Sequence, residues 1–131
     1  MPEKKILVVD DEDYQRDLMG KFLSKLGYPA TIVESPEDAL SLLNTETYPL
    51  IITDLIMLEM DGVEFCRRIR ETNSKLVIIG LSGHKRLYAP DKLKEVGFDD
   101  VLAKPINIES LKEAIEKGLE MFEARVIKKS E

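Results

Sequence analysis

The stretch IITDLIMLEMDG, residues 51–62, places one carboxylate, Asp54, between two apolar runs. Its first residues are apolar and β-branched without alternation, as is typical of a central parallel strand that is covered on both faces. An unpaired charge inside an apolar core is strongly unfavourable. We therefore expect Asp54 either to lie at the solvent-facing end of a strand or to have a cationic partner.

Four more short apolar runs accompany this one along the chain. Together they predict five strands, over 4–9, 30–34, 49–53, 75–81 and 100–103. Helical patterns lie between them, predicted over 13–26, from Ser35-Pro36, from Asp61 or Gly62, from Pro90 and from near Asn107. Residues 82–89 have no apolar stripe and predict a long loop. This alternation with short connections predicts an α/β fold, a doubly wound (βα)5 arrangement with a parallel five-stranded sheet.

The totals set broad limits on the class of protein. A chain of 131 residues fits one compact domain, and 44% hydrophobic residues exclude disorder. The net charge of −6 argues against direct nucleic-acid binding by this domain. No apolar run is long enough for a membrane span, and the N-terminus does not read as a signal peptide. The single cysteine, Cys66, suits a reducing compartment, and we expect a cytoplasmic location.

Polar residues collect where the predicted strands end. In doubly wound sheets, ligands bind beyond the carboxyl ends of the strands. The residues expected there are Asp10, Asp11, Asp54, Ser82 and Lys104. Three crowded carboxylates repel one another unless a cation joins them, and Mg²⁺ prefers such oxygen ligands. With a lysine and a hydroxyl, this set suits a phosphoryl group, and a carboxylate can itself be the nucleophile.

Four motifs carry a resemblance to a known family. ILVVDDE (6–12), IITDLIMLEMDG (51–62), LSG (81–83) and LAKP (102–105) are similar to the signature segments of the response-regulator receiver domain of two-component signalling. The resemblance covers about residues 4–122. It implies one receiver domain over 1–131 with a C-terminal tail from about 123, and a flavodoxin-like sheet with strand order 2-1-3-4-5.

The resemblance also implies a role for each residue of the set. Asp54 would accept a phosphoryl group from a histidine kinase or a histidine phosphotransfer protein. Asp11 and Asp54 would ligate Mg²⁺ directly, Asp10 would hold it mainly through water, and the main-chain carbonyl of Ile56 would complete the protein ligands. Lys104 would pair with Asp54 and then with a phosphoryl oxygen, before a cis peptide to Pro105. Ser82 would turn inward to the phosphoryl group and shift the following loop and the helix from Pro90.

Three positions depart from the family pattern or extend it. Leu58 stands where the family usually has proline, four residues after the acceptor, which predicts a more mobile loop. Val101 stands where a tyrosine or phenylalanine is usual, which removes the ring that moves with the switch hydroxyl, and Phe98 or Tyr88 is the alternative. His84 is either a modulator of dephosphorylation or a solvated loop histidine.

Other functions fit the residues less well. A Mg²⁺-dependent phosphohydrolase with an aspartyl nucleophile, as in haloacid-dehalogenase-like enzymes, has a second aspartate two residues after the first, and here that residue is Ile56. A flavodoxin-like binding module is disfavoured because the turn DDEDY would repel a cofactor phosphate, and the sequence contains neither G-x-x-x-x-G-K-[ST] nor G-x-G-x-x-G. We expect no turnover of external substrates beyond self-dephosphorylation.

The context of the domain is left open by the sequence. The chain fits a stand-alone regulator or relay intermediate, and equally the receiver part of a larger protein. A homodimer through the helix from Pro90, the strand 100–103 and the helix from near Asn107 is a further possibility for this family.

Overall fold

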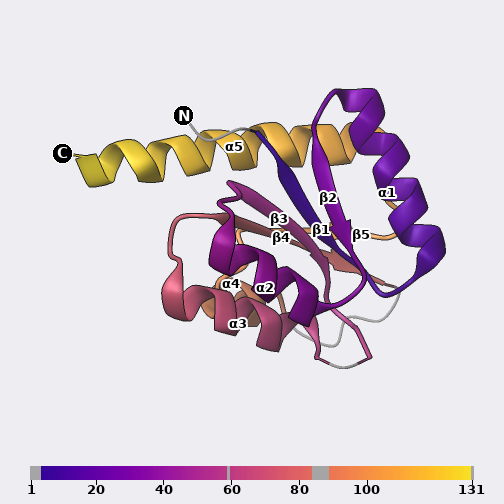
Figure 1. Ribbon diagram of the computed structural model, residues 1–131, viewed down its shortest axis with the longest axis horizontal. Coiled ribbons are helices and arrows are strands. Elements are labelled where there is room, and N and C mark those ends of the chain that lie inside the picture. Colours follow the sequence, from indigo (N-terminus) through magenta and orange to yellow (C-terminus); the bar gives the residue numbers. More distant parts are fainter. Residues whose placement is uncertain (1–3, 59, 84–88, 131) are drawn as a thin grey trace.

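Five strands alternate with five helices in the computed structural model, which describes residues 4–58, 60–83 and 89–130 (Figure 1). The strands are β1 (Ile6–Val9), β2 (Ala30–Val33), β3 (Leu50–Asp54), β4 (Val77–Ser82) and β5 (Asp100–Ala103). The helices are α1 (Asp13–Leu26), α2 (Pro36–Thr45), α3 (Gly62–Thr72), α4 (Pro90–Val96) and α5 (Ile108–Ser130). The predicted α/β fold and the five predicted strand positions are confirmed.

The strands form one parallel sheet in the order β2-β1-β3-β4-β5, the order that the family resemblance implied. The central strand β3 is buried along its whole length, whereas the edge strands β2 and β5 are only partly covered. That difference explains the sequence pattern, because a central strand contacts helices on both faces and needs apolar side chains at every position.

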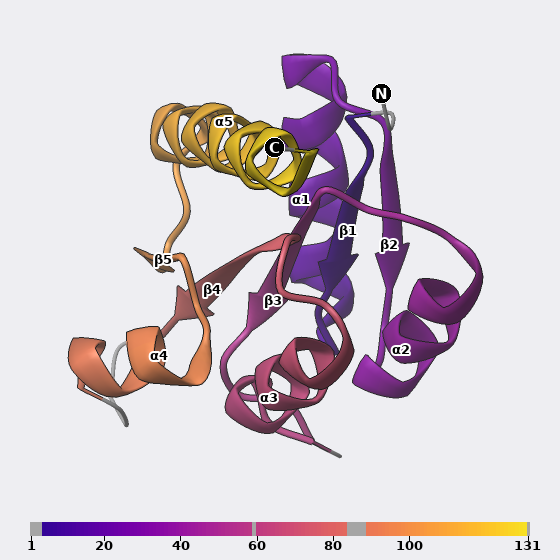
Figure 2. The same cartoon turned by 90° about the vertical axis from the view of Figure 1, so that its left-hand side faces the viewer.

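The helices cover the sheet in two layers. Figure 2 shows α1 and α5 on one face of the sheet and α2, α3 and α4 on the other. Each face has its own core: Ile52 and Ile79 pack under α1 and α5, while Ile51 and Ile78 pack under the other three helices. The parallel strands consequently end together at one end of the molecule, and α5 starts there and runs back to project beyond the opposite end (Figure 1).

The helix boundaries follow local signals in the sequence. Ser35 caps α2 by accepting a hydrogen bond from the Asp38 N–H, and Asp61 caps α3 in the same way toward Glu64. Gly27 ends α1 in the left-handed conformation, with φ of 86°. The helix α4 begins at Pro90, as predicted, and is seven residues long. None of the described helices has both the length and the apolar character to cross a membrane.

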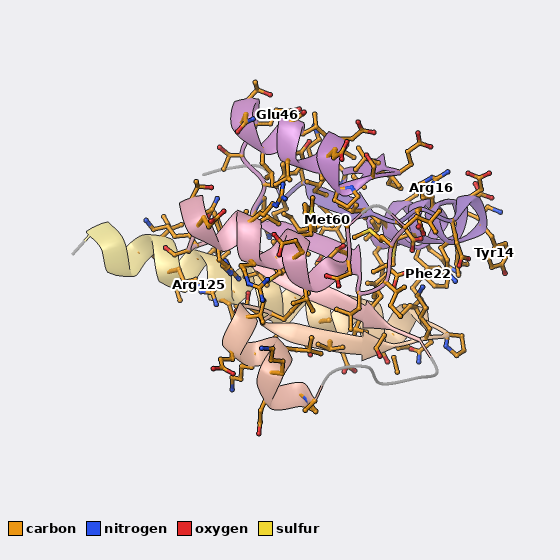
Figure 3. All side chains as sticks on the ribbon, turned by 90° about the horizontal axis from the view of Figure 1, so that it is seen from below. Tyr14, Arg16, Phe22, Glu46, Met60 and Arg125 are labelled. Atoms are coloured by element: carbon orange, nitrogen blue, oxygen red, sulfur yellow. The ribbon has the colours of Figure 1, made fainter. Side chains whose placement is uncertain are left out.

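One ionic cluster lies at the amino-terminal end of β4, away from the predicted site. The Asp99 carboxylate accepts hydrogen bonds from Arg70 of α3, from Arg125 of α5 and from the Ile78 N–H. Arg125 also donates to the carbonyl oxygen of Leu76. Figure 3 shows Arg125 toward the opposite end of the molecule from Tyr14 and Arg16. This cluster joins α3, the sheet and the C-terminal part of α5, which remains helical through the segment expected to be a tail.

The start of α3 lies directly against the backbone of Asp54. A Cβ placed on Gly62 would lie 2.4 Å from the Asp54 carbonyl oxygen and 2.8 Å from the Leu55 Cα. The Gly62 N–H donates to the Leu55 carbonyl oxygen at 2.8 Å. Only glycine allows this approach, because the atoms it would meet are backbone atoms and cannot rotate away.

We predict that Gly62→Ala destabilises the domain by about 1–3 kcal/mol, the usual range for overpacking a tight site. Urea unfolding followed by circular dichroism measures the change. Gly83→Ala is the matched control, because a Cβ on Gly83 has no atom within 4 Å. Equal stability of the two variants would contradict the packing account.

Candidate functional site

The site lies where β1, β3 and β5 end. Val9, the last residue of β1, pairs in register with Thr53 of β3, so that Asp10 and Asp54 leave neighbouring strands side by side. Asp10 is 2% exposed and Asp54 is 6% exposed. Asp54 is the last residue of β3, as predicted, and it is nearly buried there. An almost buried carboxylate requires a partner that offsets the cost of removing its charge from water.

Three carboxylates crowd this end of the sheet. One oxygen each from Asp10, Asp11 and Asp54 lies within 4.8 Å of the others. Burial, together with the charges of Asp54 and Asp11, raises the pKa of Asp10, against the opposing effects of the Glu12 N–H and Lys104. The Glu12 N–H donates to Asp10 Oδ1 at 3.0 Å, which fixes the orientation of that carboxylate.

Lys104 supplies the cation that the sequence predicted for Asp54. Its Nζ donates to Asp54 Oδ2 at 2.7 Å, and both side chains are largely buried. The Lys104 N–H donates to the Ser82 carbonyl oxygen at 2.7 Å, which ties the end of β5 to the end of β4. The peptide bond from Lys104 to Pro105 is cis, as expected. The pair thus joins residues that are fifty positions apart in the sequence.

The structure does not bring every predicted residue into the cluster equally. Ser82 ends β4, but its hydroxyl donates to the Gly83 carbonyl oxygen at 3.4 Å. Ile56 is 53% exposed, and its N–H lies 3.4 Å from Asp54 Oδ1. His84, the predicted modulator, lies outside the described residues.

Two contacts that the sequence did not predict support the acidic loops. Arg16 of α1 donates from Nη1 to the Asp10 carbonyl oxygen at 2.8 Å and pairs with Asp13 (Figure 3 labels Arg16). The Leu58 N–H donates to Asp11 Oδ2 at 3.0 Å. Contacts of this kind to main-chain groups leave no residue-type signal in a single sequence.

The chemistry of the donor set fits a hard divalent cation. The cluster offers oxygen ligands, carries more negative charge than Lys104 balances, and includes a carboxyl whose pKa is raised by its neighbours' charges as well as by burial. Mg²⁺ is held in proteins by one or two carboxylates, with water and phosphate oxygens. This arrangement can position a phosphoryl group between a carboxylate and an ammonium.

Comparisons with known proteins agree with this geometry. The sequence pattern of the response regulator receiver domain matches residues 6–116. The chain belongs to this family. The receiver protein CpdR of Brucella abortus is 33% identical over 116 residues, which cover 88% of this chain and 97% of CpdR. The receiver domain of the Francisella response regulator 1452 has a TM-score of 0.82 at 26% identity, covering 90% of this chain and 98% of that one.

Sensor kinases are also among the relatives of this receiver domain. The sensor histidine kinase RcsC of Salmonella typhi is 31% identical over 110 residues, which are 84% of this chain and 12% of RcsC. The sensor protein EvgS of Escherichia coli is 36% identical over 113 residues, 86% of this chain and 9% of EvgS. The chain therefore spans only a small part of the length of these relatives. It is a receiver domain of two-component signalling, a type found both alone and within larger proteins.

In the receiver domain, a hollow lies beside Ser82. Val101 pairs with Gly80 in the sheet, and a hollow of about 600 Å³ is lined by Ser82, Phe98, Val101, Lys104 and residues of α4. Phe98 is 3% exposed, and its ring would lie 3.1 Å from a Cβ on Gly80. The ring is thus held against β4 in the core, while Tyr88, the other aromatic alternative, lies outside the described residues.

Cys66 is a core residue of the receiver domain. It is fully buried among the side chains between α3 and the sheet. Burial raises the pKa of its thiol to about 11. The reactive thiolate is therefore scarce at neutral pH, and Cys66 has no part in the site.

We predict that Asp10→Asn stabilises the metal-free domain at pH 7, by about 1 kcal/mol or more, because it removes one charge from a crowded cluster. The asparagine oxygen can still accept the Glu12 N–H. Since the folded-state pKa of Asp10 is raised, the cost of ionising it is absent below its unfolded pKa and complete above its folded pKa. The gain should therefore disappear at acid pH.

Urea unfolding in the presence of a chelator, at pH 7 and near pH 3, measures this difference. If Asp10→Asn is less stable than the wild type at pH 7, other groups already offset the repulsion among the three carboxylates, and the prediction is wrong. The exposed carboxylate Asp17 on α1 provides the control, because Asp17→Asn should change stability little at either pH.

Proposed function

We propose that this receiver domain is a phosphorylation switch in which Asp54 accepts a phosphoryl group from a histidine kinase or a histidine phosphotransfer protein. The observation that carries the proposal is the setting of Asp54 itself. Its carboxylate is almost buried, bonded to Lys104 Nζ at 2.7 Å and crowded by Asp10 and Asp11. Such a carboxylate is held in a fixed orientation beside the charges that phosphoryl transfer needs.

The transfer is a substitution at phosphorus. An oxygen of the Asp54 carboxylate forms a bond to phosphorus while the bond from phosphorus to the donor's histidine nitrogen breaks. The leaving imidazole keeps the electron pair and takes a proton from solvent. Lys104 stays close to the reacting centre and balances the negative charge on the phosphoryl oxygens. Positioning and charge stabilisation account for most of the catalysis in such reactions.

The acidic cluster would hold the divalent cation. Asp11 and Asp54 are the direct carboxylate ligands in this proposal, Asp10 acts mainly through water, and the Ile56 main-chain carbonyl completes the protein ligands. When bound, Mg²⁺ neutralises the carboxylates and the phosphoryl oxygens, which otherwise repel one another. The fold of the chain would hold these oxygens close together before the cation binds.

Switching would follow from a change of hydrogen bonds at Ser82 and Lys104. The present bond of the Ser82 hydroxyl, 3.4 Å to the Gly83 carbonyl oxygen, is long and therefore weak. A phosphoryl group on Asp54 carries roughly two negative charges in place of the single charge of the carboxylate, and its strong acceptor oxygens would draw the hydroxyl inward. The hollow lined by Ser82, Val101 and residues of α4 would leave room for α4 to adjust. Phosphorylation would thereby favour one of two arrangements of this face.

The wider role follows from the relatives. Similarity to CpdR over nearly its whole length supports a stand-alone regulator, and similarity to short parts of RcsC and EvgS supports a receiver within a larger signalling protein. We infer a cytoplasmic location, with self-dephosphorylation and no turnover of external substrates. A homodimer through α4, β5 and α5, and modulation of dephosphorylation by His84, remain predictions.

Incubation with acetyl phosphate or phosphoramidate and Mg²⁺ should add the mass of one phosphoryl group to the intact protein. Asp54→Asn should abolish this addition, because an amide oxygen is a poor nucleophile and does not form the acyl phosphate. Mass spectrometry of the intact chain provides the measurement, and Asp17→Asn, an exposed site on α1, serves as the control. Equal modification of the Asp54→Asn variant would refute the assignment of the acceptor.

Asp11→Ala should weaken Mg²⁺ binding and slow phosphorylation at limiting Mg²⁺, because it removes a direct ligand. Loss of a metal ligand should reduce the affinity by at least the ~10-fold that is usual for outer-shell changes. Isothermal titration with Mg²⁺ measures the affinity without any phosphoryl donor. An unchanged affinity would remove Asp11 from the ligand set.

A further inference from the structure

Leu58 combines an exposed side chain with a specific main-chain contact. Its side chain is 95% exposed on the loop between β3 and α3, although the preceding residue, Met57, is buried. Its N–H donates to Asp11 Oδ2 at 3.0 Å, across 47 positions of the sequence. What Leu58 contributes to the fold is therefore its main-chain donor. A proline, the usual residue here in the family, has no N–H and cannot make this bond.

The bond holds Asp11 in a position that suits a cation. With this hydrogen bond in place, Asp11 presents a carboxylate oxygen within 4.8 Å of oxygens from both Asp10 and Asp54. An ionised carboxylate has about four acceptor positions, so one N–H leaves room for a metal ligand bond. The contact therefore orients the carboxylate without using up its capacity to bind.

We propose that the Leu58 N–H is a positioning donor that orients Asp11 for a divalent cation. The inference rests on the proposed function only in taking Asp11 as a metal ligand. Ligating carboxylates are commonly fixed by hydrogen bonds from outside the ligand shell, and loss of such a bond lowers metal affinity by roughly 10–100-fold. Here the donor is a main-chain group, so its presence depends only on the residue not being proline.

The matching contact on Asp10 supports this reading. The Glu12 N–H donates to Asp10 Oδ1 at 3.0 Å, so each of the two adjacent carboxylates is held by one main-chain donor. The donor to Asp10 comes from the same loop, whereas the donor to Asp11 comes from the loop that follows the phosphoacceptor. Leu58 therefore links the position of Asp11 to the loop that starts at Asp54.

The test compares Leu58→Pro, which removes the donor, with Leu58→Ala, which keeps the donor and removes the exposed side chain. Mn²⁺, which prefers the same oxygen ligands, is the probe, and electron paramagnetic resonance counts the free ion. We expect binding about 10-fold weaker in Leu58→Pro and nearly unchanged in Leu58→Ala. Wild-type affinity in Leu58→Pro, or an equal loss in Leu58→Ala, would overturn the proposal.

A second readout separates positioning from general damage to the site. In Leu58→Pro, the Mg²⁺ concentration for half-maximal phosphorylation by acetyl phosphate should rise about 10-fold, while the rate at saturating Mg²⁺ stays near that of the wild type. A fall in the saturating rate with unchanged Mg²⁺ dependence would show that the loop, and not Asp11, was altered, and would count against the proposal.

A third variant removes the N–H without adding a proline ring. Semisynthesis can replace the peptide bond before Leu58 by an ester, which keeps the side chain and deletes only the donor. The ester should bind Mn²⁺ about as weakly as Leu58→Pro, and wild-type affinity in the ester would overturn the inference. These binding measurements need no phosphoryl donor. If the wild-type chain binds Mn²⁺ more tightly than both variants that lack the N–H, but takes no phosphoryl group at Asp54, the proposed function is refuted and the inference about Leu58 stands.

Discussion

Crowding of three carboxylates at one end of a parallel sheet is the constraint on which the site depends. Asp10, Asp11 and Asp54 converge within 4.8 Å, and the chain supplies one ammonium, Lys104, at 2.7 Å from Asp54. One lysine cannot balance three ionised carboxylates. Burial raises the pKa of Asp10, and repulsion from the neighbouring carboxylates raises it further. The folded domain thus keeps a local excess of negative charge that a divalent cation would relieve.

Main-chain groups hold this crowded cluster in place. Gly62 lets α3 begin against the Asp54 backbone, Arg16 holds the Asp10 carbonyl oxygen, and the N–H groups of Glu12 and Leu58 fix the adjacent carboxylates. Each contact reaches the site from a different element or loop. Preorganisation of this kind means that little conformational freedom is lost when ligands bind.

The departures from the usual receiver pattern have different structural outcomes. At Val101, a small side chain lines a hollow beside α4, and the nearby ring of Phe98, the aromatic alternative that the structure describes, is buried against Gly80. At position 58, leucine has an N–H that the usual proline lacks, and this N–H donates a hydrogen bond to Asp11. The sequence identified both positions, but which atoms would contact them depended on how separate loops pack.

The sequence predicted the order of elements, the doubly wound fold and the residues that meet at the strand ends, because apolar runs, caps and prolines are local signals and parallel strands end at one edge. The family resemblance also implied the pair of Asp54 and Lys104, which the structure contains. The sequence did not indicate that Asp54 is nearly buried, that Ser82 bonds Gly83, or that Asp99 joins Arg70 and Arg125. These contacts join residues far apart in the chain or depend on the choice of rotamer. Long-range contacts and rotamers leave no periodic or local pattern in a single sequence, because packing between elements sets them.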